Sequence, residues 1–471
     1  MVFSSTVFLF LFFPLVLIGY YNPVFKSRKF KNIFLLAASL GFYAWGEPVF
    51  VFVMLFSIWL NWLIGLKIAD AKNQKIRKTF MILAVSFNIS LIFVFKYLTF
   101  VCENINLIAK TDFLSLNIAL PIGISFFTFQ IISYILDIYN KKATAQKNFL
   151  NTALYISLFP QLVAGPIVRY ETIADEILNR KESVKDFVDG FSRFITGLAK
   201  KVLVANYAGF IADKVFTIGE SGGMPPDLSI AVVWLGAICY TIQIYFDFSG
   251  YSDMAIGIGR MFGFHFPENF NYPYIAKSIT EFWRRWHISL SSFFRDYLYI
   301  PLGGNRVSKK RLFLNLFIVW TLTGVWHGAN WTFLAWGFFY FVLLAAEKFT
   351  GFDKRLGVFG HFYTMLFVII GWVLFRSESI LQAGYYFRVM FGFGANPLTD
   401  ELFFYYFNAC KIILFTGILF SLPVVPFIRN KLLANPKLYE ILGSVRIAVL
   451  FVIAISVCVR ATYNPFIYFN F

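Results

Sequence analysis

The chain has 471 residues, of which 59% are hydrophobic and 21% aromatic, whereas only 14% are charged. A soluble domain usually carries about a quarter charged residues, so this composition excludes a soluble protein. Apolar runs of about 20 residues, the length that crosses a bilayer, follow one another along the chain. We therefore expect an all-α polytopic membrane protein with about ten to twelve transmembrane helices plus re-entrant or interfacial helices. Residues 1–471 are expected to form a single membrane-embedded domain.

The formal net charge of +17 comes from basic residues in short loops between the apolar runs. Short cytoplasmic loops of membrane proteins are enriched in Lys and Arg. We therefore attribute the charge to membrane topology and expect no binding of nucleic acid. The four cysteines are scattered, and no His, Cys and carboxylate pattern has the spacing of a metal site, so we expect no metal.

The first apolar run, about residues 7–18, lacks a basic region and a small-residue cleavage site and is predicted to be a first span. Basic clusters at 26–31 and 67–78 flank a longer run that Gly46, Glu47 and Pro48 interrupt, so both clusters are expected in the cytoplasm. The amphipathic block 191–204 is typical of an interfacial or re-entrant helix. The later spans are expected at 80–101, 113–136, 312–326, 331–346, 362–375, 403–427 and 445–459, and turns without evident chemistry at 219–227 and 392–401.

Three polar clusters lie in these apolar surroundings, where an ionisable side chain is costly and is a functional candidate by default. The first, residues 245–253, places Asp247 and Asp253 beside a helix break expected at Gly250. The carboxylates could line a polar cavity, or they could cap helices and pair with nearby arginines. The sequence leaves both interpretations open.

The second cluster, residues 281–297, is expected to be a helix with a polar stripe that includes His287 and is flanked by Trp283 and Trp286. It could be an interfacial helix with tryptophan anchors. Alternatively, Arg284 and Arg285 could bind an anionic, phosphate-bearing donor such as coenzyme A from the cytoplasm. The basic loop 305–311 would then add steering charge.

The third cluster, residues 323–331, surrounds His327 at the apex of a predicted helical hairpin. Sixteen helical residues after Arg311 rise about 24 Å, which places His327 deep in the membrane. Such a histidine could be a hydrogen-bonded core residue or a group that transfers protons near neutral pH. His265 and His361, in or beside loops, are expected to be structural or at the surface.

Several motifs resemble the membrane-bound O-acyltransferase family, in particular its bacterial branch that O-acetylates polysaccharides such as alginate and peptidoglycan. The resemblance implies a ring of transmembrane helices around a thin, water-accessible centre. It also implies that the family's principal histidine is His327 and its second histidine His287. The matching segments are 4–47, 160–166, 245–253, 266–273, 281–305 and 323–331.

The C-terminal segment 464–471 contains Phe466, Tyr468 and Phe471, which resemble the acyl-carrier motif Phe-x-Tyr-x-x-Phe of the accessory peptide in teichoic acid D-alanylation. By composition alone, the segment could be an aromatic belt at the membrane surface. The resemblance implies instead that Tyr468 carries the acyl group.

The resemblance thus implies an O-acyltransferase in the bacterial cytoplasmic (inner) membrane that holds no permanently bound cofactor and uses acetyl-CoA as donor. His327 would act as general base on the Tyr468 phenol, His287 would orient the donor or support the site, and the C-terminus would be extracytoplasmic. The acetyl group would pass to an extracytoplasmic SGNH hydrolase-like transferase and then to a polysaccharide. Direct acylation of the glycan, D-alanylation of teichoic acid, and a transporter or flippase with a proton relay are the alternatives. The residues expected to bind substrate are Trp283, Arg284, Arg285, Trp286, Trp326, Asn330 and Asp247.

Overall fold

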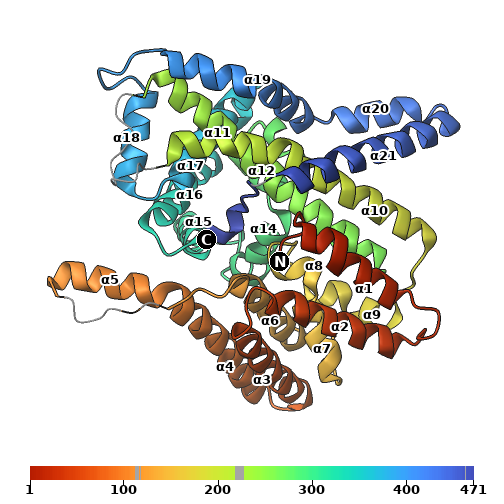
Figure 1. The fold of residues 1–471 in the computed structure, drawn as a ribbon. Coiled ribbons are helices and arrows are strands. Elements are labelled where there is room, and N and C mark those ends of the chain that lie inside the picture. The colour runs from red at the N-terminus through yellow and green to blue at the C-terminus, as the bar shows by residue number, and fades with distance from the viewer. Residues whose placement is uncertain (112–115, 117, 218–227, 462, 471) are drawn as a thin grey trace. The chain divides into compact units, whose positions relative to one another are not determined.

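The computed structural model describes residues 1–111, 116, 118–217, 228–461 and 463–470. Over these residues the chain is helical and contains no strand (Figure 1). Eight helices of the described part are long and apolar enough to cross a membrane, and two shorter apolar helices, Phe8–Tyr20 and Ile124–Tyr139, accompany them. The predicted all-α polytopic fold is confirmed.

The chain forms two compact units, one comprising Met1–Phe194 and Tyr251–Glu268, the other Ile195–Gly250 and Asn269–Phe471. In the first unit, the predicted turn at Gly46–Pro48 separates two long helices. The helices of this unit are η1 (Phe8–Phe12), α1 (Phe13–Tyr20), α2 (Arg28–Ala44), α3 (Phe50–Asp70), α4 (Gln74–Ile92), η2 (Phe93–Tyr97), α5 (Leu98–Ala109), α6 (Ile124–Tyr139), α7 (Phe149–Ser157), α8 (Phe159–Leu162), α9 (Tyr170–Asn179) and the first part of α10 (Val184–Ala199).

The second unit holds the candidate site and the C-terminal segment. The boundaries between the units fall within α10 and α12. Its helices are η3 (Lys200–Ala205), α11 (Asn206–Phe216), α12 (Ile230–Met261, up to Gly250), η4 (Pro273–Ile275), α13 (Ile279–Arg285), α14 (Ile288–Phe294), η5 (Arg295–Tyr299), α15 (Lys309–His327), α16 (Trp331–Thr350), η6 (Phe352–Arg355), α17 (Phe359–Arg376), α18 (Ile380–Met390), α19 (Glu401–Ser421), α20 (Val424–Leu432), α21 (Pro436–Arg460) and η7 (Ile467–Asn470).

The predicted α15–α16 hairpin is confirmed, and glycines lie where its two helices contact each other. A Cβ atom added to Gly324 would lie 2.4 Å from the carbonyl oxygen of Phe333, and one added to Gly337 would lie 2.5 Å from that of Trp320. Small residues at a helix interface let two backbones approach closely. The hairpin therefore holds His327, the last residue of α15, in a fixed position beside α16.

Two predictions about the polar clusters are wrong. No helix break occurs at Gly250, because α12 continues through it; a Cβ atom there would lie 2.8 Å from the carbonyl oxygen of Gly197, so this glycine serves close packing. Conversely, residues 281–297 are not one helix. The helix is interrupted at His287, which has a left-handed backbone conformation with φ of 45°.

Three other predictions are corrected or limited by the structure. The amphipathic block 191–204 belongs to a helical stretch, Val184–Phe216, whose 33 residues are enough to cross a membrane. The run 403–427 ends at Ser421, because Pro423 precedes a separate helix, α20. The predicted turn at 219–227 and part of the span predicted at 113–136 lie outside the described residues, whereas the turn at 392–401 is found.

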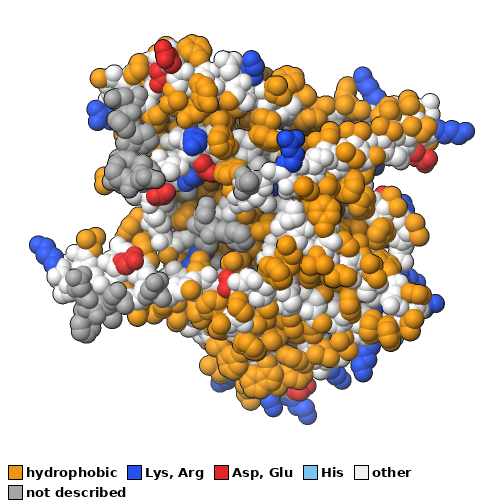
Figure 2. Space-filling view, viewed as in Figure 1, with side chains coloured by type: hydrophobic (Ala, Val, Ile, Leu, Met, Phe, Trp, Pro, Cys, Tyr) orange, Lys and Arg blue, Asp and Glu red, His pale blue; other side chains and the backbone are white. Residues whose placement is uncertain are grey.

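Helices α19 and α21 expose apolar side chains over most of their length, and only 11% of the apolar window of each is buried. Figure 2 shows these hydrophobic side chains along α19 and α21, with Lys and Arg side chains at the far end of the α20–α21 hairpin. Apolar walls ending in basic residues are typical of helices that face lipid and end at a membrane surface.

Candidate active site

A cavity of about 670 Å³ lies among α13, α14, α15 and α16 of the second unit, and both His287 and His327 line it. Its wall also carries three basic residues, Arg284, Arg295 and Lys348. Lys348 lies in the last turn of α16, at the end of the hairpin where α15 begins with Lys309. The cavity therefore connects the histidines with the basic end of the hairpin and has the volume of a small-molecule site.

His287 lies at the turn between α13 and α14, and Asn269 holds this turn. The Asn269 carbonyl oxygen accepts a hydrogen bond from the Ile288 amide at 2.9 Å, and its Oδ1 accepts from the Ser289 amide at 3.1 Å and from Ser289 Oγ at 2.9 Å. A left-handed conformation costs a non-glycine residue about 1–3 kcal/mol and persists only where its surroundings impose it. The loop at Asn269 thus fixes the direction of the His287 ring.

The start of α13 is fixed by a carboxylate from α16. Buried Glu347 accepts hydrogen bonds from the Ile279 amide at 2.6 Å, the Thr280 amide at 2.8 Å and Thr280 Oγ1 at 2.6 Å. These amides are among those that have no partner within a helix. Glu347 therefore anchors the helix that carries Trp283 and Arg284.

The C-terminal segment enters this unit and ends beside α14 and α15 (Figure 1). The Tyr468 hydroxyl lies 3.2 Å from His287 Nε2, within hydrogen-bonding distance. The Tyr468 ring stacks on Phe248 of α12, with 4.3 Å between the ring centroids. The structure therefore brings the predicted carrier tyrosine to one of the two predicted histidines.

His287 and Tyr468 both lie outside the helices that are long enough to cross a membrane. Burial lowers the pKa of His287 to about 3, so its imidazole is neutral at pH 7 and Nε2 can accept a hydrogen bond. Burial also raises the pKa of the Tyr468 phenol. The phenol is therefore protonated at neutral pH and needs a base in contact with it before it can act as a nucleophile.

His327 packs against several aromatic rings. Its ring centroid lies 5.0 Å from Trp326, 4.9 Å from Trp336 and 5.1 Å from Phe375, in edge-to-face arrangements. Trp326 also contacts the second histidine, with its centroid 6.2 Å from that of His287. Trp326 thus packs against both histidines.

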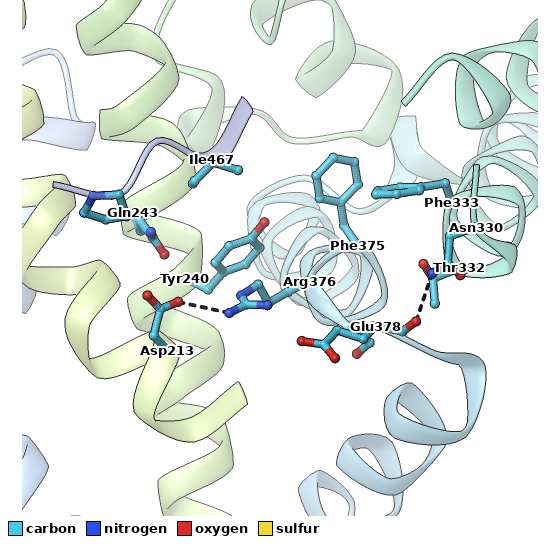
Figure 3. Close-up of a pocket in the computed structure, with 12 residues that line it drawn as sticks. Asp213, Tyr240, Gln243, Asn330, Thr332, Phe333, Phe375, Arg376, Glu378 and Ile467 are labelled. Carbon is cyan, nitrogen blue, oxygen red and sulfur yellow. Dashed lines mark hydrogen bonds and ion pairs between the residues drawn. The ribbon is translucent and has the colours of Figure 1, made fainter. Parts of the chain in front are cut away.

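A second cavity, of about 330 Å³, is lined by residues of α11, α12, α16, α17 and the C-terminal segment (Figure 3). Phe333 and Phe375 line it and also contact the His327 ring. Asp213 and Arg376 face each other across part of it, with 3.0 Å between their charged groups. Two cavities therefore approach His327, and the rings of Phe333 and Phe375 lie between it and the smaller one.

The structure separates the residues that the sequence predicts to bind substrate. Trp283, Arg284 and Trp286 line the larger cavity. Arg285 instead pairs with Glu281 at 2.9 Å and lines neither described cavity.

Asn330 lines the smaller cavity, where its side chain donates to the Glu378 carbonyl at 2.9 Å. Asp247 is fully buried, lines neither cavity and pairs with Lys201 at 2.9 Å. Asp253 pairs with Arg193 at 2.8 Å, as the structural interpretation of the first cluster expects.

The other two histidines line neither cavity. His265 is exposed and lies 2.8 Å from Glu176, and His361 Nδ1 lies 3.3 Å from the Ala276 carbonyl oxygen. Among the described residues, no group of three His, Cys, Asp or Glu side chains could hold a metal ion.

Sequence reasoning missed Lys201, Asn269, Glu347 and the contact of Phe248 with Tyr468. A signal existed for Lys201, since a lysine in an apolar helix is a functional candidate by the same rule that selected the aspartates. No comparable signal existed for Asn269, because its role depends on a backbone conformation at a residue 18 positions away.

A sequence model of the membrane-bound O-acyltransferase family matches residues 76–387. The chain belongs to the membrane-bound O-acyltransferase family. It is similar to probable alginate O-acetylases of Pseudomonas syringae pv. tomato, at 43% identity over 85% of this chain and 77% of that protein, and of Pseudomonas putida, at 39% identity over the whole length of both. It is also similar to the peptidoglycan O-acetyltransferase of Helicobacter pylori, at 35% identity over 81% of this chain and 78% of that protein. The chain is thus a multi-pass membrane O-acyltransferase.

Proposed function

We propose that this acyltransferase moves an acetyl group from cytoplasmic acetyl-CoA to Tyr468, from which an extracytoplasmic SGNH-type transferase passes it to a polysaccharide. The observation that carries this proposal is the Tyr468 hydroxyl, 3.2 Å from His287 Nε2, a histidine of the cavity that His327 also lines. The relatives named for O-acetylation of alginate and of peptidoglycan support a polysaccharide as the final acceptor.

The larger cavity is the proposed donor site. Its basic residues, Arg284, Arg295 and Lys348, suit the phosphates of coenzyme A, and Trp283 and Trp286 offer apolar contacts. Because basic ends of membrane helices are retained in the cytoplasm, the proposal places the opening beside Lys348 on the cytoplasmic side.

In the proposed reaction, the Tyr468 oxygen attacks the thioester carbonyl carbon while His287 Nε2 accepts the phenol proton. The C–S bond breaks, the thiolate of coenzyme A receives a proton, and acetyl-Tyr468 remains. The sequence gives the role of base to His327, but the hydrogen bond described here makes His287 the proton acceptor in our proposal. His327, in the wall of the same cavity, is then placed to donate a hydrogen bond to the thioester or to protonate the thiolate.

The smaller cavity is the proposed route to the outside. The C-terminal segment lines it with Pro465, three residues before Tyr468, and with Ile467, the residue directly before Tyr468. In this proposal the acetylated phenol lies between the donor cavity and an extracytoplasmic opening, and the C-terminus lies on the extracytoplasmic side of the inner membrane.

The substitution Tyr468→Phe tests the function in cells, since it removes only the nucleophilic oxygen and keeps the stacked ring. We expect loss of polysaccharide O-acetylation with normal amounts of protein in the membrane. The matched control is Tyr405→Phe on α19. Tyr405 is 70% exposed and lies more than 60 residues before Tyr468 in the sequence. Normal acetylation in the Tyr468→Phe strain would overturn the carrier role and favour direct acylation of the glycan.

Mass spectrometry of the C-terminal peptide tests the identity of the acyl group. Purified protein incubated with acetyl-CoA, or with an activated D-alanyl donor, is digested and its C-terminal peptide weighed. We expect an acetyl adduct that is absent from His287→Ala. A D-alanyl adduct without an acetyl adduct would instead support D-alanylation.

A further inference from the structure

A buried ion pair lies beside the C-terminal segment and is not part of either cavity wall. Lys201 Nζ of η3 lies 2.9 Å from Asp247 Oδ1 of α12, and the two side chains are 3% and 0% exposed. Removing two charges from water is costly, and an apolar pair of similar size is often equally stable or more stable. Stability alone therefore gives no reason for these charges.

Both members of the pair also bind the backbone of the C-terminal segment. Lys201 Nζ donates a hydrogen bond to the carbonyl oxygen of Pro465. Asp247 Oδ2 accepts a hydrogen bond from the amide of Ile467 at 3.2 Å. The two ions thus hold the backbone on both sides of Phe466, and Tyr468 is the next residue after the second contact.

We propose that Lys201 and Asp247 form a clamp for the C-terminal segment, with both acting as positioning residues that place the Tyr468 hydroxyl on His287. This inference rests on the proposed carrier role of Tyr468. A hydrogen bond with an ionised partner is stronger than a neutral one, and a buried pair is little weakened by salt. Because the clamp binds backbone atoms, it holds the segment in the same register before and after the phenol is acetylated.

The clamp accounts for the placement of Asp247, which the sequence predicts to bind substrate and which the structure removes from both cavities. It also gives a function to the ammonium group of Lys201, which is buried in an apolar helix. Two other contacts near the end of the chain lie further from Tyr468: the Tyr463 hydroxyl donates to Asp213, and Asn206 Nδ2 lies 3.5 Å from Asn464 Oδ1.

Hydrogen–deuterium exchange of the full-length protein in detergent tests the clamp without any donor present. The double variant Lys201→Met/Asp247→Leu replaces both ions by apolar side chains, so no charge is left unpaired. We expect the peptide that contains Tyr468 to exchange at least tenfold faster than in the wild type, while peptides from α17 exchange as before. The variant Lys411→Met, which removes an exposed lysine of α19, is the matched control and should leave exchange of the C-terminal peptide unchanged.

The same variants are then assayed for acetyl transfer to Tyr468. A positioning role predicts at least a tenfold lower kcat with an unchanged KM for acetyl-CoA, because the donor site is intact. Should the double variant fail to fold, Asp247→Asn decides, since it keeps the size and one acceptor oxygen and removes the charge; it should show the same two effects to a smaller degree.

The clamp is overturned as a positioning device if the C-terminal peptide of the clamp variants exchanges at the wild-type rate. Faster exchange together with an unchanged kcat overturns it as well. Failure of the proposed function is a different result. If wild-type protein forms no acyl-Tyr468 but the double variant still loosens the segment, the clamp stands as a binding site for the segment and the carrier role fails.

Discussion

Asn269 holds the turn that directs His287, and Asn269→Ala tests the contribution of its side chain. Asn269 is 2% exposed, and its Oδ1 accepts two hydrogen bonds from Ser289. At about 1 kcal/mol for each net hydrogen bond, the alanine variant should lose about 2 kcal/mol of stability. That loss is comparable with the strain of about 1–3 kcal/mol that a left-handed residue such as His287 carries. The turn is therefore expected to relax and to move the His287 ring away from Tyr468.

A displacement of about 1 Å of a reacting group can lower a rate by about a hundredfold. We accordingly expect Asn269→Ala to reduce kcat for acetyl transfer to Tyr468 by ten- to a hundredfold, measured at saturating acetyl-CoA with labelled donor. The control Ser289→Ala removes only one of the two hydrogen bonds and should cost about half as much stability. A wild-type kcat for Asn269→Ala would refute the argument that the Asn269 loop positions His287.

Two further predictions concern donor binding and helix packing. Arg284→Ala should raise KM for acetyl-CoA about tenfold, because it removes one hydrogen bond to a charged group. Arg285→Ala should leave KM unchanged, because Arg285 pairs with Glu281 outside the cavity. Equal effects of the two variants in steady-state kinetics would contradict the role of Arg284 in donor binding. Gly324→Ala should destabilise the protein by about 1–3 kcal/mol in thermal unfolding, because the added Cβ atom would meet the Phe333 backbone. Gly384→Ala should be neutral or slightly stabilising, because no atom lies within 4 Å of a Cβ atom added there. Equal melting temperatures for the two glycine variants would show that the hairpin does not depend on close packing.

Hydropathy and loop charges were sufficient to predict the helical class and the α15–α16 hairpin, because a span must satisfy its own backbone hydrogen bonds and reads as a continuous apolar run. The same reasoning failed at Gly250 and at His287. Glycine in a sequence indicates either a break or a close contact, and only the position of the Gly197 carbonyl shows that Gly250 serves contact. The helical spacing of residues 281–297 suggested one helix, and the break at His287 is imposed by Asn269, a contact over 18 residues.

The candidate site shows the same division. Residue type and motif brought out His287, His327, Arg284 and Tyr468, whose chemistry is visible in the sequence. The pairing of Lys201 with Asp247 is a contact between two helices, which no local pattern reveals. The exchange of roles that we propose between the two histidines likewise follows from one distance, that between Tyr468 and His287.

The most direct measurement is mass spectrometry of the C-terminal peptide from purified wild-type protein and its His287→Gln variant after incubation with acetyl-CoA. We expect one acetyl group on Tyr468 of the wild-type peptide and none on the variant. An unmodified wild-type peptide, from protein that nonetheless supports polysaccharide acetylation in cells, would contradict the carrier role of Tyr468.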